Sequence, residues 1–211
     1  MIGQAVRRSG GRPTATAAAA LETAILDRAT AAFLADGYAA TTIEAIARTC
    51  SVAKRTIYAR WNGKPALFRA VLEGLIAKWM SGAGDWADGD TPEAALKAAA
   101  DDILSVALTP EAIALHRLII AESGRFPELP LILHQTGAGQ GTTRIAALLD
   151  RAIARGALPP QDTAFAAEQF LNLLLTGPQR RALGLGSPLD SDQIRNWRDK
   201  AVALFLSGIA A

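Results

Sequence analysis

Residues 41–67 read TTIEAIARTCSVAKRTIYARWNGKPAL. The stretch opens with Thr41-Thr42-Ile43-Glu44, which has the Ser/Thr-x-x-Glu form of a capping box and predicts a short helix over about 42–48. Cys50-Ser51 predicts a tight break before a second short helix over 53–59. Because helices this short are marginal alone, both are expected to pack against a neighbouring element.

A longer helix is expected before this pair, over about 17–36. Gly37 is well placed to take the left-handed conformation that ends such a helix. Three helices joined by short turns have the layout of a helix-turn-helix unit, whose last helix enters the major groove of DNA. The apolar residues of the long helix follow the spacing of one helical face: Leu21, Ile25, Ala29, Ala32 and Phe33.

The net charge of +2 is unevenly distributed along the chain. Residues 1–69 hold ten Lys/Arg and four Asp/Glu, whereas the remainder holds 12 basic and 16 acidic residues. This asymmetry suggests a small module for a polyanion and a larger body with another role. A chance distribution of solvated charges is the alternative at this point.

The second short helix supplies the candidate contacts to DNA. Lys54, Arg55 and Thr56 lie at its exposed start, and lysine or arginine reaching guanine is the commonest specific base contact. Phosphate contacts are expected from residues that follow along its exit, namely Tyr58, Arg60 and Lys64. Capping, packing and solvation are the alternatives for single residues, but their combination at this spacing favours DNA.

The composition predicts an all-α protein, because 45 Ala and 26 Leu stand against five Val. With 50% hydrophobic and 20% charged residues, fibrous and wholly disordered classes are excluded. The single cysteine, Cys50, excludes an intramolecular disulfide and a cysteine-based zinc site. No signal peptide and no transmembrane helix are recognised, so a cytoplasmic protein without a membrane partner is expected.

About nine helices are expected in all. After the first three, helices are expected over 64–80, 92–108, 110–123, 128–136 (extending or breaking before 142–155), 161–183 and 191–208, with a break at Gly137–Gly141 among others. The expected organisation is a flexible basic arm over 1–16, a helix-turn-helix DNA-binding domain over 17–63, and a larger C-terminal regulatory and dimerisation domain over 64–211.

The quoted stretch resembles the DNA-binding domain of the TetR family of transcription regulators. The resemblance implies that Thr41 or Thr42 donates to a phosphate, that Tyr58 and Lys64 grip the opposite side, and that Lys54 and Arg55 read bases. Arg60 stands where the family usually has histidine and keeps a cationic phosphate contact. The residues that carry the likeness are Thr41-Thr42-Ile43, Ile46-Ala47, Val52, Thr56-Ile57-Tyr58, Trp61, Lys64 and Leu67.

The N-terminal arm contains Arg7, Arg8, Arg12 and Pro13. It resembles the basic extensions that some members of the family insert into the minor groove, where arginines sense narrow A·T tracts. Arg12 is therefore a further candidate DNA contact, and a disordered tail is the alternative.

The body of the chain resembles the AefR-like C-terminal class of the same family. The likeness lies in His116–Glu122 with Arg125–Leu129, and in Ala167–Leu171 with Arg180–Gly184. It implies a helical domain that senses a ligand and forms a dimer. Because repression is the commonest behaviour in this family, the resemblance further implies a repressor that a small molecule releases from its operator.

The last two expected helices also carry apolar stripes, which predict a four-helix interface between two copies of the chain. A two-fold homodimer would place two recognition helices on the half-sites of a palindromic operator of double-stranded DNA. Core packing within one chain is the alternative. The predicted interface residues are Leu171, Leu174, Leu175, Trp197, Ala201, Leu204 and Phe205.

A ligand pocket is expected among the helices of the C-terminal domain. A shift of the helix over 64–80 is expected to couple this pocket to the helix-turn-helix domains of the two chains. The candidate pocket walls are His116, Ile119, Ile120, Glu122, Phe126, Phe165 and Gln169.

No catalytic constellation is found. Two histidines eighteen positions apart have no metal-binding spacing, and the Gly137–Gly141 cluster follows no strand. The sequence therefore predicts no enzyme, no metal and no cofactor. The competing interpretation is an all-helical carrier or enzyme for an apolar ligand that binds no specific DNA.

Overall fold

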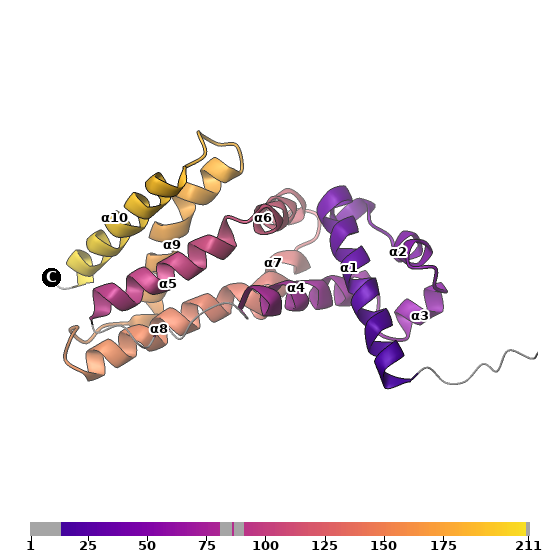
Figure 1. Cartoon of the computed structure of the whole chain (residues 1–211), viewed down its shortest axis with the longest axis horizontal. Coiled ribbons are helices and arrows are strands. Elements are labelled where there is room, and N and C mark those ends of the chain that lie inside the picture. The colour runs from indigo at the N-terminus through magenta and orange to yellow at the C-terminus, as the bar shows by residue number, and fades with distance from the viewer. Residues whose placement is uncertain (1–13, 81–85, 87–90, 210–211) are drawn as a thin grey trace, which may run out of the picture.

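The computed structural model describes residues 14–80, 86 and 91–209. Across these residues the chain forms ten α-helices, one π-helical turn and no strand, which confirms the all-α prediction. The helices are α1 (Ala15–Ala40), α2 (Ile43–Thr49), α3 (Lys54–Tyr58), α4 (Lys64–Met80), α5 (Pro92–Ala107), α6 (Pro110–Glu122), α7 (Glu128–Leu133), α8 (Gly139–Ala154), α9 (Thr163–Ala182) and α10 (Ser191–Ile209). Figure 1 shows α2 and α3 at one end of the molecule and α9 with α10 at the other.

The helix termini show why these segments fold as they do. Thr42, Thr91, Thr109 and Asp162 each accept a hydrogen bond from a backbone N–H of the first turn that follows. Proline occupies the first turn of both α5 and α6, where its missing N–H costs no helical hydrogen bond.

Of the two alternatives for the helix over 128–136, extension into the next helix is confirmed, and the break expected at Gly137–Gly141 is wrong. The chain continues from α7 through the π-helical turn His134–Ala138 directly into α8. The turn packs against α4, and the buried Thr136 hydroxyl donates to the Ile132 carbonyl at 2.8 Å. Tertiary packing thus outweighs the weak helix propensity of glycine here.

The first hydrophobic core joins α1, α2 and α3 to α4, α6 and α7. At its centre the ring of Tyr38 packs edge to face on Phe68 and Phe126, with centroids 5.2 and 4.9 Å apart. The three N-terminal helices therefore share one core with helices beyond the expected boundary at residue 64.

The second core lies between α5, α8, α9 and α10. Trp86 enters it from the segment between α4 and α5, and its indole N–H donates to Asp102 at 2.7 Å. The Arg144 guanidinium lies 3.7 Å from the centre of the Trp86 ring. Trp86 is thus held by side chains of α5 and α8.

The interface stripes predicted on the last two helices face mainly the core of their own chain. Leu174, Ala201 and Phe205 are buried there, whereas Leu204 is exposed. The half-buried Leu171 and Leu175 border this core. Trp197 is also half-buried, and its indole N–H donates to the Leu174 carbonyl at 3.0 Å. Core packing within one chain thus accounts for most of the stripe, because α9 and α10 pack on each other and on α5.

Among the described helices, no single one is long and apolar enough to cross a membrane. Helices α5 and α6 reach the required hydropathy only as a pair, which is bent by 72°.

Candidate nucleic-acid interface

Helix α3 is fixed in the fold by Ile57, which is fully buried, while its charged residues point outward. The α2–α3 connection turns at Ser51, whose φ of 53° is the one positive value at a non-glycine among the described residues. Lys54, Arg55 and the ring of Tyr58 are exposed, and Thr56 and Arg60 are partly buried. One face of a short helix thus presents two cations beside an aromatic ring.

Arg55 is the candidate base reader that is ready to bind. Within the described part of the chain, its guanidinium makes no hydrogen bond and no ion pair. Such a group offers five donors in a fork that matches the acceptor edge of guanine.

Lys54 is held differently. Its ammonium forms an exposed ion pair with Glu44 of α2 and lies 5.5 Å from the centre of the Tyr58 ring. The hydrogen bond between Lys54 and Glu44 raises the pKa of Lys54 and lowers the pKa of Glu44. Exposed pairs are weak, so DNA could displace Glu44 at small cost.

The capping box is wrong in its details. The cap is Thr42 and not Thr41, and its exposed hydroxyl oxygen accepts from the Ala45 N–H at 3.1 Å. The Glu44 carboxylate accepts from its own backbone N–H in the first turn and also pairs with Lys54. Thr41 is buried, and its hydroxyl donates to the Gly37 carbonyl at 2.7 Å. Thr41 therefore cannot donate to a phosphate in this conformation, and Thr42 alone keeps that role as a prediction.

Lys64 is also not a free phosphate contact. Its ammonium donates to the carbonyls of Tyr38 and Thr41 at 2.8 and 3.1 Å. Burial lowers its pKa, which the nearby carboxylate of Glu122 partly offsets. The lysine at the start of α4 thus holds the end of α1. No sequence pattern indicates this contact, because the partners of Lys64 are backbone atoms.

The remaining predicted contacts have mixed outcomes. Arg60 is partly buried and donates to the Thr56 carbonyl at 3.3 Å, which leaves it at the exit of α3. Arg12, with Arg7 and Arg8, lies outside the described residues. Arg48, in the last turn of α2, is exposed, and it is a further cation of this region that the motif did not single out.

The seven predicted pocket residues do not meet in one cavity. Ile120, Phe165 and Gln169 are exposed, Ile119 is buried in the first core, and His116 is half-buried, with burial lowering its pKa. Phe126 packs on Tyr38, and Glu122 binds the backbone of Ala39. Helical periodicity identified apolar faces here but not the helices that cover them.

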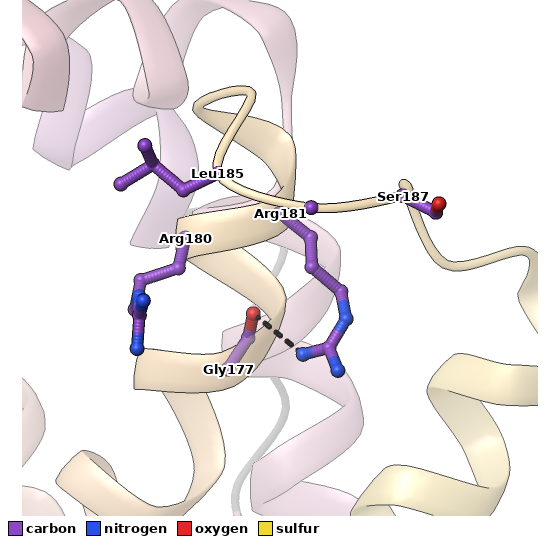
Figure 2. Close-up of a pocket in the computed structure, with 6 residues that line it drawn as sticks. Gly177, Arg180, Arg181, Leu185 and Ser187 are labelled. Atoms are coloured by element: carbon purple, nitrogen blue, oxygen red, sulfur yellow. Dashed lines mark hydrogen bonds between the residues drawn. The ribbon is translucent and has the colours of Figure 1, made fainter.

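The described cavities lie elsewhere. One of about 370 Å³ lies at the C-terminal end of α9 (Figure 2). Its Arg181 donates to the Gly177 carbonyl at 3.1 Å. It is lined by Gly177, Arg180, Arg181, Leu185, Gly186 and Ser187. Another, of about 270 Å³, lies between α5 and α10, and neither cavity is lined by any of the seven residues.

The strained turn at Ser51 gives a stability prediction. We expect Ser51→Gly to stabilise the protein by roughly 0.5–1 kcal/mol, because glycine adopts this φ without the Cβ clash that serine suffers. Thermal unfolding followed by circular dichroism should show a melting temperature about 2 °C higher. The matched control, Ser207→Gly in the exposed part of α10, should lower it. A lower melting temperature for Ser51→Gly would contradict the strain.

Comparison with known proteins covers both parts of the chain. Residues 25–71 match the family model described as bacterial regulatory proteins, tetR family, and residues 94–208 match the C-terminal domain of AefR-like transcriptional repressors. No curated protein matches the chain significantly.

Solved structures agree over almost the whole length. A putative TetR-family transcriptional regulator from Mesorhizobium loti is 26% identical, with a TM-score of 0.78 over 94% of this chain and 100% of that one. The flavonoid-responsive regulator FrrA is 29% identical, with a TM-score of 0.77 over 90% and 97%. The transcriptional regulator FadR from Bacillus subtilis, solved with stearoyl-CoA, is 16% identical and shares the fold, with a TM-score of 0.71 over 89% and 98%. The chain therefore belongs to the TetR family of DNA-binding transcriptional regulators, with an AefR-like C-terminal domain.

Proposed function

We propose that this regulator is a repressor that binds a palindromic operator as a homodimer and leaves it when a small molecule binds the C-terminal domain. The proposal is supported mainly by the exposed guanidinium of Arg55, which has no hydrogen-bond or ion-pair partner among the described residues. It lies on a short helix whose inner face is held in the core by the buried Ile57. In this proposal Lys54, Arg55 and Thr56 read bases, while Thr42, Tyr58 and Arg60 contact phosphates. The basic arm with Arg12 supplements them in the minor groove.

The homodimer is proposed to form through the exposed edge of the α9–α10 pair. Phe165 near the start of α9 and Leu204 near the end of α10 are 61% and 63% exposed. Because a short connection makes the two helices antiparallel neighbours, these two ends lie at the same end of the pair (Figure 1). A second copy covering this edge would hide apolar surface that one chain leaves in water.

The domain boundary near residue 63, a cytoplasmic location and the absence of enzymatic activity complete the proposal. They are supported by the family of transcriptional regulators to which the chain belongs.

A salt titration on duplex DNA tests the proposal. Affinity for a preferred duplex, selected from a random pool, should fall steeply as salt rises, since phosphate contacts release counterions. Discrimination against a scrambled duplex should persist at physiological salt, by roughly 10³-fold or more. Equal affinity for both duplexes would contradict the proposal and favour a carrier whose basic N-terminal part binds no specific site.

The ligand is proposed to be a small aromatic molecule, on the likeness to the flavonoid-responsive regulator FrrA. A panel of flavonoids titrated against the complex with the preferred duplex should include compounds that release the DNA. To move the protein from 99% bound to 99% free, such a compound must bind the DNA-free state about 10⁴-fold more tightly. Unchanged DNA affinity at saturation with every flavonoid that binds the protein would contradict release by this class.

A further inference from the structure

Residues 37–41 comprise the end of α1 from its kink at Gly37 onward, together with Thr41, the residue that follows α1. This segment, called the connector below, is shaped by its own backbone and by one hydroxyl. Gly37 breaks the helical run with φ 84° and ψ 168°. The Thr41 hydroxyl then donates to the carbonyls of Gly37 and Ala32, at 2.7 and 3.2 Å. The connector leads directly into α2 and so sets the direction in which the α2–α3 pair leaves α1.

A carboxylate from the C-terminal domain reaches the connector from outside. Both oxygens of Glu122, the last residue of α6, accept from the Ala39 N–H, at 2.9 and 3.0 Å. The contact is so close that a Cβ on Gly37 would lie 2.8 Å from Glu122 Oε1. Two segments 83 positions apart are thereby joined by a charge-assisted hydrogen bond.

The connector carbonyls are held at the same time by α4. The Lys64 ammonium donates to Tyr38 and Thr41 and lies 4.5 Å from the centre of the Tyr38 ring. Glu122 therefore accepts a hydrogen bond from a backbone N–H of the connector, while Lys64 donates hydrogen bonds to two of its carbonyls.

The surroundings leave this segment little freedom. Tyr38 is 1% exposed and packs between Phe33, Phe68 and Phe126. Phe126 follows α6 by four residues, so the same end of the C-terminal domain contributes both the ring and the carboxylate. Moving the end of α6 would have to move the connector or break this packing.

We propose that Glu122 is a positioning residue for DNA recognition, which fixes the connector and the α2–α3 pair to the C-terminal end of α6. This inference rests on the proposed role of α3 as the reading helix. The Glu122–Ala39 contact is a direct hydrogen bond between the C-terminal domain and the helix-turn-helix domain. It links the two domains independently of any movement of α4. A displacement of the end of α6 then changes the orientation of α3.

Substitution of Glu122 tests the inference. Glu122→Ala should lower affinity for the preferred duplex about 10-fold with an unchanged salt slope, because no phosphate contact is lost. Hydrogen exchange should rise across residues 42–58 and stay unchanged in α9 and α10. Glu122→Gln should restore most of the affinity, since its amide oxygen can accept from the Ala39 N–H.

Glu111→Ala is the matched control, because it removes a carboxylate from the opposite end of α6, where Glu111 pairs with Lys78 at 3.2 Å. It should bind DNA like the wild type. If Glu122→Ala does not fold, Glu122→Asp retains the charge but shortens the reach, and it should show the same loss.

Two results would overturn the inference: wild-type affinity and exchange in Glu122→Ala and Glu122→Asp, or a Glu122→Gln variant as defective as Glu122→Ala. Failure of the proposed function would look different, because the wild type itself would then prefer no duplex.

Discussion

A negative charge at Leu204 is expected to dissociate the proposed homodimer. The side chain is 63% exposed on α10, so Leu204→Glu is tolerated by a single chain but would bury an unpaired carboxylate between two. The cost of several kcal/mol exceeds the roughly 2.8 kcal/mol that corresponds to a 100-fold loss. Light scattering after size-exclusion chromatography should show a monomer, and operator affinity should fall at least 100-fold as the two heads act separately.

Leu131→Glu is the matched control for this prediction. Leu131 is 61% exposed on α7, away from the α9–α10 edge. The same substitution there should leave a dimer with wild-type DNA affinity. A Leu204→Glu protein that remains dimeric would show that two copies meet through another surface.

Removal of the Arg55 side chain is expected to weaken recognition and change its specificity. A bidentate contact to a base contributes about 1–3 kcal/mol of discrimination, so Arg55→Ala should lower operator affinity on the order of 10–100-fold. Preference at one base pair of each half-site should disappear, while affinity for a scrambled duplex should change much less. Competition binding with single-base operator variants measures both.

Lys54→Ala should have a smaller effect than Arg55→Ala, because Lys54 must first leave Glu44 to reach DNA. Arg155→Ala removes an equal charge from an exposed position just beyond α8 and is the matched control. If Arg55→Ala and Lys54→Ala both keep full discrimination, the bases are read by other residues.

Much of the fold was predictable because its signals are local. Threonine caps, prolines in first turns and helical apolar spacing predicted most helix positions within a few residues. Glycine was less informative. Gly37 does interrupt α1 at a positive φ, but the cluster over 137–141 remains helical because it packs against its neighbours.

For the candidate DNA-binding site, the sequence predicted correctly only which side chains of α3 are exposed. The exposure of Lys54 and Arg55 followed from the burial of Ile57 on the same short helix. Thr41 and Lys64 could not be judged in this way, because their partners are carbonyl groups brought close by tertiary packing. The presence of a threonine or lysine in a motif does not show whether its side chain donates hydrogen bonds to DNA or to the protein's own backbone.

The C-terminal domain was harder still. An apolar stripe predicts that a face is covered but not by which element, so Leu174 and Phe205 face their own chain instead of a partner. Glu122 was expected in a pocket and instead binds Ala39, because residues 83 positions apart give no local pattern.

The proposed function requires a pair of chains to read a two-fold symmetric duplex through α3. The decisive measurement is selection of bound duplexes from a random pool, followed by sequencing and by determination of the number of chains per duplex. We expect an enriched inverted repeat whose half-sites are centred about one helical turn or more apart and which two chains occupy. A pool without any enriched motif, or a single asymmetric half-site held by one chain, would contradict it.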